Sequence, residues 1–158
     1  DALAIALMKK KNFSKLDFKK FHPSGSLANK LKTAEDLMLT KKKIPFVNEN
    51  QSLQKTLHIL NSKKLGFVLI TDNQNLTKGI FTDGDLKRLI RKKREIYNLK
   101  VKSVMVKNPY SVEKNMLASD ILMQMNKKKI TNICVYDKEN KHKTIGILHI
   151  HDLLKRFR

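Results

Sequence analysis

The side chains best suited to chemistry lie in a seven-residue segment, GIFTDGD, which runs from Gly79 to Asp85. Thr82 and Asp85 stand three residues apart, where an apolar, β-rich run gives way to a helical pattern. The start of a helix offers unpaired N–H groups and the positive end of its dipole to a phosphate. A carboxylate can accept hydrogen bonds from both hydroxyl groups of a ribose, as acidic residues do in dinucleotide-binding folds. One interpretation of the segment is therefore a nucleotide site.

The same two residues also have a purely structural interpretation. Thr82 as the N-cap of a helix and Asp85 three residues later form a capping box, in which each side chain accepts a backbone N–H. Such a cap stabilises a protein by about 1 kcal/mol and binds nothing. The two interpretations are compatible, because a capping threonine can also contact a ligand, and the spacing leaves both open.

The second copy of this segment, GILHIHD, ends at Asp152 and places His149 where the first copy has Thr82. His151 follows, and an H-x-H-D pattern suggests a metal site. A zinc site takes three or four protein ligands, however, and the only cysteine, Cys134, lies inside an apolar run, where we expect a small core residue. No metal is therefore predicted. The chain also has no Walker loop, CxxC or GxGxxG motif and no Ser-His-Asp order.

Both segments belong to an internal repeat. Residues 65–86 and 130–153 each contain an apolar run ending in Asp, a polar turn, a Gly followed by two apolar residues, and an Asp-Leu pair six positions after that Gly. Three pairs of residues are all 67 positions apart: Gly79 and Gly146, Asp85 and Asp152, Met38 and Met105. This constant offset predicts two copies of one structural unit.

The periodicity of apolar residues predicts the elements of each copy. Residues 66–71 and 78–82 flank the turn sequence DNQN and predict a hairpin, as do residues 132–137 and 144–149 around DKENKH. Apolar residues recur at helical spacing before and after each hairpin: Leu53, Leu57 and Leu60; Leu117, Ile121 and Met125; Leu86, Leu89 and Ile90; Leu153, Leu154 and Phe157. Each half is therefore predicted to be strand, helix, strand, strand, helix.

The fold class that follows is α+β. A half of about 60 residues buries too little surface to be stable alone. We therefore expect the two halves to pack sheet against sheet around a shared core, with a pseudo-two-fold axis between them.

The composition limits the class of protein further. The chain has 158 residues, of which 41% are hydrophobic and 30% charged, as is typical of globular proteins. No apolar run reaches the roughly 20 residues needed to span a bilayer. A single cysteine cannot form an internal disulfide, which favours a reducing compartment and a cytoplasmic location. Because the chain starts at Asp1 with no signal pattern, we expect a fragment of a longer protein.

The net charge of +20 would attract phosphates, nucleic acid or anionic lipid. Five of the 34 basic residues are Arg, so 29 (34 − 5) are Lys, and Arg is the side chain suited to bidentate contacts with bases and phosphates. Aromatic residues make up 6% of the chain with no Trp, which leaves few platforms for stacking on single strands. A solvated lysine-rich surface is favoured, and a nucleic-acid-binding protein stays as the alternative from another class.

The repeat unit resembles the CBS domain family, named after cystathionine β-synthase. The pattern of that family is Gly, two apolar residues, Ser or Thr, two residues and Asp. GIFTDGD matches it at every position, and GILHIHD departs from it at His149. The resemblance covers residues 33–158 and implies a pseudo-symmetric pair with two clefts that commonly hold adenosyl or other nucleotide ligands. Such pairs usually regulate another domain on the same chain.

The leader resembles a narrower family. DALAIALM and HPSGSLANKL are similar to the end of the sugar isomerase domain in arabinose-5-phosphate isomerases, and IFTDGDLKR and LHIHDLL are similar to the ends of that family's CBS domains. The departures are Ser24, where the family has Gly, and Asn29. The resemblance implies a parent enzyme that interconverts ribulose 5-phosphate and arabinose 5-phosphate for the synthesis of Kdo and lipopolysaccharide. It also implies a catalytic role for His22, in the full-length enzyme only.

This resemblance divides the chain into residues 1–32 as the remnant of the isomerase domain, 33–98 as the first CBS domain and 99–158 as the second. Alone, the chain is expected to bind rather than to catalyse. We expect a homodimer of CBS pairs, within a tetramer in the full-length enzyme, and no membrane or nucleic-acid partner. A purely structural pair that holds the oligomer together is a further alternative.

No cofactor is expected, but a regulatory ligand is. The resemblance suggests the nucleotide sugar CMP-Kdo, with AMP or ATP as the alternative. One cleft is expected to use Gly66, Phe67, Thr82, Asp83 and Asp85. The other is expected to use Thr131, Asn132, His149, His151 and Asp152. All of these ligands are anions, which suits a basic protein.

Overall fold

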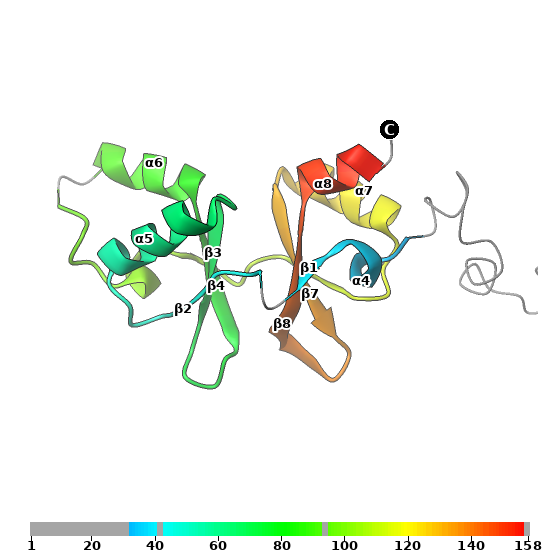
Figure 1. Ribbon diagram of the computed structural model, residues 1–158, viewed down its shortest axis with the longest axis horizontal. Coiled ribbons are helices and arrows are strands. Elements are labelled where there is room, and N and C mark those ends of the chain that lie inside the picture. Colours follow the sequence, from blue (N-terminus) through cyan, green and yellow to red (C-terminus); the bar gives the residue numbers. More distant parts are fainter. Residues whose placement is uncertain (1–31, 41–42, 93–94, 157–158) are drawn as a thin grey trace, which may run out of the picture.

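The computed structural model describes residues 32–40, 43–92 and 95–156 of the chain. Two four-stranded mixed sheets lie side by side in the middle of the molecule, and helices cover their outer faces (Figure 1). The first repeat consists of β2 (Phe46–Asn48), α5 (Leu53–Lys63), β3 (Phe67–Thr71), β4 (Thr77–Thr82) and α6 (Asp83–Lys92). The second consists of β6 (Ser111–Glu113), α7 (Ala118–Lys128), β7 (Asn132–Asp137), β8 (Asn140–His149) and α8 (Ile150–Arg156). The predicted α+β class and order of elements are confirmed in both repeats.

Each sheet takes an edge strand from the segment that precedes the opposite repeat. β1 (Leu39–Thr40) comes before the first repeat but pairs antiparallel with β8, which gives the order β1-β8-β7-β6. β5 (Val106–Lys107) comes before the second repeat but pairs with β4, which gives the order β2-β3-β4-β5. The short helices next to these strands pack on the same half as the strands do. α4 (Ala34–Leu37) joins the core of the second half, and η1 (Val101–Ser103) joins that of the first. The sequence pattern did not predict this exchange.

The exchange explains two of the constant spacings in the sequence. Met38, just before β1, packs on Gly146 of β8, and Met105, just before β5, packs on Gly79 of β4. A Cβ atom at Gly146 would lie 2.9 Å from the Cβ atom of Met38, and one at Gly79 would lie 2.9 Å from the carbonyl oxygen of Val106. Glycine is required at both positions, because only a residue without a side chain lets the exchanged segment approach so closely.

A shared apolar cluster joins the two sheets. Its buried members come from both sides of the interface: Ile44, Phe67, Leu69, Ile80, Cys134 and Ile147. Beside it, the hydroxyl oxygens of Thr77 and Thr144 lie 2.7 Å apart and share a hydrogen bond. These two residues are themselves 67 positions apart, and equivalent residues of two copies meet where the symmetry axis passes between them. The predicted shared core and pseudo-two-fold axis are thus confirmed.

Each hairpin is followed directly by a helix, and the starts of these two helices lie at the same end of the molecule. α6 begins at Asp83, directly after β4, and α8 begins at Ile150, directly after β8. Figure 1 shows α6 and α8 on one side of the sheets and the two hairpin turns on the opposite side. No helix in the described part of the chain has the length and apolar character needed to cross a membrane.

Candidate functional site

A cavity of about 480 Å³ lies between the repeats, beside the start of α6. It is lined by seven of the ten residues predicted for the two nucleotide clefts: Gly66, Thr82, Asp83, Asp85, Thr131, Asn132 and His149. The sequence assigned these residues to two clefts, one for each repeat. The structure instead brings both sets to the wall of one cavity, because the ends of β4 and β8 lie close together across the axis.

The remaining predicted residues lie elsewhere. Phe67 is buried in the cluster between the sheets. His151 and Asp152 are exposed in the first turn of α8 and do not line the cavity. His22 belongs to the leader, residues 1–31, which lies outside the described part of the chain.

Seven other residues that line the cavity were not among the predicted site residues, and Arg88 and Val106 are the most informative of them. Arg88 lies one helical turn after Asp85, and the spacing of three residues on α6 was the available signal for it. Val106 reaches the cavity because β5 joins the sheet of the first repeat. No local pattern could have placed Val106 there, because its position depends on the strand exchange.

The Thr82–Asp85 pair forms the predicted capping box. The backbone N–H and the hydroxyl of Thr82 both donate to Oδ2 of Asp85, at 2.9 and 2.7 Å, and the N–H of Asp85 donates to Oγ1 of Thr82 at 3.2 Å. Nη2 of Arg88 donates to the other carboxylate oxygen, Oδ1, at 2.5 Å. Only 9% of the Asp85 surface is exposed. Three hydrogen bonds occupy a group with about four lone-pair sites, so one site remains for a ligand hydroxyl.

A second threonine–aspartate pair shows how much of this geometry is structural. At the start of α4, the N–H and the hydroxyl of Thr33 donate to Oδ2 of Asp36 at 2.7 and 2.9 Å. This box repeats the arrangement at Thr82 and Asp85, but neither residue lines the cavity. The T-x-x-D pattern therefore caps a helix wherever it occurs, and only its position beside the cavity distinguishes the first-repeat copy.

The cavity combines an acidic pair with positive charge. Asp83, Asp85, Arg88 and Lys129 all line it, and the ten-residue helix α6 begins beside it. Arg88 is held at one nitrogen by Asp85 while 66% of its side chain is exposed, so its other donors remain free for an anion. Helix N–H groups and a guanidinium are the donors that phosphate prefers in proteins.

His149 takes the place of Thr82 in the second repeat and caps α8 in a different way. Its ring nitrogen Nδ1 accepts a hydrogen bond of 3.2 Å from the backbone N–H of His151. Burial lowers the pKa of His149, as do the charges of His151 and Lys155, while Asp152 opposes the shift. A neutral imidazole is the form that can accept this bond. Within the described ranges, no three His, Cys, Asp or Glu side chains are grouped to hold a metal ion.

Asn132 lines the cavity and carries a buried acceptor. In the second hairpin Asn132 pairs with His149, and in the first hairpin Phe67 pairs with Thr82. Asn132 therefore occupies the position that a core phenylalanine occupies in the first repeat. Its Nδ2 group donates to Oγ1 of Thr131 at 3.2 Å. Its Oδ1 atom is buried and accepts no hydrogen bond from the described residues. A ligand N–H or O–H group would satisfy this atom.

Comparison with known proteins supports the assignment of the repeat. The family described as CBS domain matches residues 34–92 and 101–158. Arabinose 5-phosphate isomerase KdsD of Francisella tularensis is 40% identical over 156 residues, which cover 98% of this chain and 47% of that protein. KdsD of Escherichia coli K12 is 37% identical with the same coverage. The chain thus spans about half the length of the curated relatives it matches.

Solved structures share the fold at lower identity. The CBS domain pair of MJ0100, in complex with 5′-methylthioadenosine and S-adenosyl-L-methionine, has a TM-score of 0.71 at 17% identity and covers 80% of this chain and 96% of its own. The CBS domain of a bacterial CNNM/CorC family Mg2+ transporter, in complex with ATP, has a TM-score of 0.70 at 18% identity, with coverages of 83% and 90%. CBSX2 in complex with AMP has a TM-score of 0.66 at 24% identity, with coverages of 78% and 93%. The described residues thus adopt the fold of a CBS pair.

Proposed function

Because the chain belongs to the CBS domain family, with two domains in tandem, we propose that it is the regulatory, nucleotide-binding part of an arabinose 5-phosphate isomerase. The observation that carries this proposal is the cavity between the repeats. It places a carboxylate with one free lone-pair site beside a helix start and a partly free guanidinium. This is the set of groups that a ribose phosphate requires.

Each part of a nucleotide has a partner among the lining residues. One ribose hydroxyl group binds at the free site of Asp85, and the phosphate binds at the N-terminus of α6 and at Arg88. The base lies against the apolar side chains of Leu65, Val106 and Ile130. The amino group of the base, which adenine and cytosine both carry, donates to Oδ1 of Asn132. A volume of about 480 Å³ lies within the usual range of about 300–1,000 Å³ for small-molecule sites.

Two ligands fit this description. CMP-Kdo follows from the similarity to KdsD isomerases, because a nucleotide sugar made from the product of the parent enzyme is suited to feedback control. AMP and ATP follow from the structural neighbours that hold adenine nucleotides. The isomerase reaction itself belongs to the full-length enzyme, with His22 as a catalytic residue, and we expect none from residues 1–158 alone.

Apolar side chains on the outer helices support a second role, in assembly. Ile90 on α6, Met123 on α7 and Leu154 on α8 are exposed, Met123 to 69%. Large exposed apolar side chains on neighbouring helices are typical of surfaces that associate. We propose that these helices form a homodimer of CBS pairs, as part of a tetramer in the parent enzyme. A monomer by light scattering at high micromolar concentration would contradict this role.

The nucleotide proposal is tested by calorimetric titration of AMP, ATP and CMP-Kdo into wild-type protein and Asp85→Ala. We expect at least one of these ligands to bind, and Asp85→Ala to lose about tenfold or more in affinity, because a charge-assisted hydrogen bond contributes about 1.5–3 kcal/mol. Asp36→Ala is the matched control, since it removes the equivalent cap away from the cavity. Both variants should lose about 1 kcal/mol of unfolding free energy, and only Asp85→Ala should lose affinity. Equal affinity in all three proteins would remove Asp85 from the site.

A further inference from the structure

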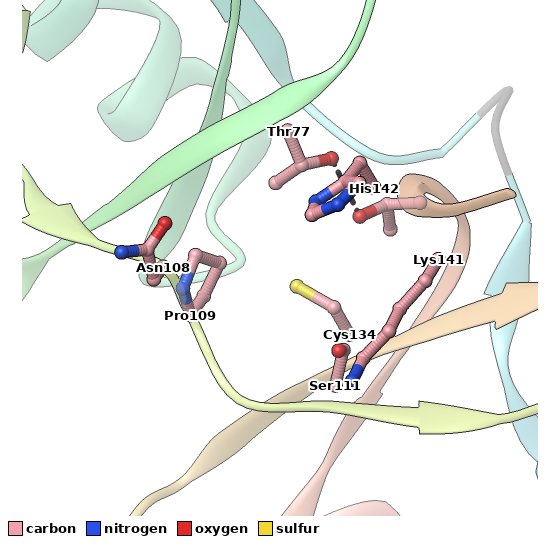
Figure 2. A pocket seen from close by; sticks show the side chains of 8 residues that line it. Thr77, Asn108, Pro109, Ser111, Cys134, Lys141 and His142 are labelled. Atoms are coloured by element: carbon pink, nitrogen blue, oxygen red, sulfur yellow. Dashed lines mark hydrogen bonds between the residues drawn. The ribbon is translucent and has the colours of Figure 1, made fainter.

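We propose that the chain has a second ligand site, for a small phosphorylated polyol, at the hairpin end of the interface between the repeats. A cavity of about 220 Å³ lies there, and six of the eight residues that line it carry polar side chains, which present both polar and apolar atoms to it. Figure 2 shows Thr77, Pro109, Cys134 and His142 around one space, with the sulfur of Cys134 directed into it.

This cavity is separate from the nucleotide cavity. The two have no lining residue in common. On β4, Thr77 at the first position lines one cavity and Thr82 at the last position lines the other. On β8, Thr144 and His149 are divided in the same way. Five residues of extended strand span about 17 Å, so two ligands can bind at the same time.

The floor of the cavity is polar because the two repeats differ at one strand pair. In the first sheet Phe46 pairs with Leu69, and in the second sheet Ser111 pairs with Cys134 at the equivalent register. A hydroxyl and a thiol therefore replace a phenyl ring and an isobutyl group beside the core between the sheets. Burial raises the pKa of the Cys134 thiol to about 12, so this group stays neutral and weakly donating.

The lining groups suit an anion that carries hydroxyl groups. Ser111, Thr77 and Thr144 line the cavity from three different strands, and each carries a hydroxyl group. The Thr77–Thr144 hydrogen bond uses one of its two hydroxyl protons, and the Thr144 hydroxyl also interacts with the Cys134 thiol, so the Ser111 hydroxyl is the clearest donor for a ligand. Lys141 and His142 are exposed at the rim. Among the described residues that line the cavity none is acidic, so nothing there repels a phosphate.

The size of the cavity selects the class of ligand. Sites for drug-sized molecules measure about 300–1,000 Å³, and a volume of about 220 Å³ lies below that range. A nucleotide therefore does not fit, whereas the phosphate monoester of a short polyol does. Its hydroxyl groups replace water at the threonine and serine side chains, and its phosphate stays at the rim beside the Lys141 ammonium.

The test is a titration of isotope-labelled protein, residues 1–158, with glycerol 3-phosphate, inorganic phosphate and glycerol, followed by amide chemical shifts. We expect saturable shifts at Ser111, Cys134 and Thr144, with glycerol 3-phosphate binding at least about threefold more tightly than either fragment, since it makes both the hydroxyl contacts and the ionic contact. Equal binding of phosphate and glycerol 3-phosphate, or shifts only at residues of the nucleotide cavity, would overturn the proposal.

Four variants make the test independent of overall charge and of folding. Lys141→Gln should weaken glycerol 3-phosphate by about fivefold, the upper end for an exposed ionic contact. Lys143→Gln removes the same charge two residues away and does not line this cavity, so it should change the affinity little. Equal effects of the two variants would indicate non-specific attraction to a basic surface and refute the site. Ser111→Phe, which copies Phe46 of the first repeat, should abolish binding, while Asp85→Ala should leave it unchanged.

Discussion

The helices that follow the two hairpins, α6 and α8, start at equivalent positions and are capped by different chemistry. In the first repeat a hydroxyl and a carboxylate close a box at Thr82 and Asp85. In the second repeat a ring nitrogen of His149 accepts one backbone N–H, and Asp152 is exposed. Both caps accept a backbone N–H of the first helical turn, so the repeated scaffold tolerates either cap. Only the first arrangement leaves a carboxylate and a guanidinium at the wall of the cavity. The repeats thus share a scaffold and differ in binding chemistry.

The largest expected effect is on the shared scaffold. Gly146→Ala places a Cβ atom against Met38, whose own Cβ lies 2.9 Å away. Overpacking of this kind costs about 1–3 kcal/mol, because the exchanged segment must move. The free energy of unfolding from urea titration should fall by that amount. Gly84→Ala is the control, since its nearest neighbour would be 3.5 Å away. A Gly146→Ala protein as stable as wild type would show that the strand exchange does not require glycine at this position of the repeat.

A smaller effect is expected where an amide replaces a core side chain. Asn132→Leu removes a buried oxygen that lacks a partner among the described residues, so the unfolding free energy should rise by about 1 kcal/mol. Affinity for AMP should fall several-fold in the same variant, because the base loses its acceptor. Asn126→Leu on the exposed face of α7 should change stability by less than about 0.5 kcal/mol. Loss of stability in Asn132→Leu would show that the amide is satisfied within the protein.

The smallest effect concerns the pH dependence of the second cap. The pKa of His149 is lowered in the folded protein from its ordinary value of 6.5. The unfolded chain therefore takes up a proton at higher pH than the folded one, so the contribution of His149 to stability is present above about pH 6.5 and is lost as the pH falls through the folded pKa. The loss should not exceed about 1 kcal/mol, because solvent screens a partly exposed group.

His149→Thr sharpens this comparison by giving the second repeat the cap of the first. The variant should show a flatter stability profile than wild type between about pH 5 and 7, since a threonine hydroxyl does not titrate there. Above about pH 7 the two proteins should be similar, because a neutral histidine and a threonine both accept the N–H. Identical profiles over the whole range would exclude His149 as the titrating group.

Most of the secondary structure could be predicted from the local sequence pattern. The hairpins were predicted to within a residue or two, except that β8 starts earlier, at Asn140, because the hairpin pairing extends into the turn. The strands β1 and β5 escaped prediction because two residues carry no measurable periodicity. Their partners lie 106–108 and 26–28 residues away along the chain.

The candidate site was predictable only in part, for a related reason. Thr82 and Asp85 carry a motif, and the offset of 67 transfers it to the second repeat. Phe67 and Asn132 occupy equivalent register positions, yet one is buried between the sheets and the other lines the cavity. A chemical difference at equivalent positions, rather than the repeat itself, determines which residues meet a ligand.

By itself the sequence determined the two copies, the order of their elements and the cap at Thr82 and Asp85, because each depends on periodicity or on residues close together in the chain. Only the tertiary structure decided that members of both predicted sets line one cavity, that Arg88 and Val106 join them, and that Ser111 and Cys134 line a second cavity at the opposite end. These contacts cross the axis between the repeats. They depend on which sheet receives each edge strand. Pairing between strands that are far apart in the chain gives no signal in the local sequence.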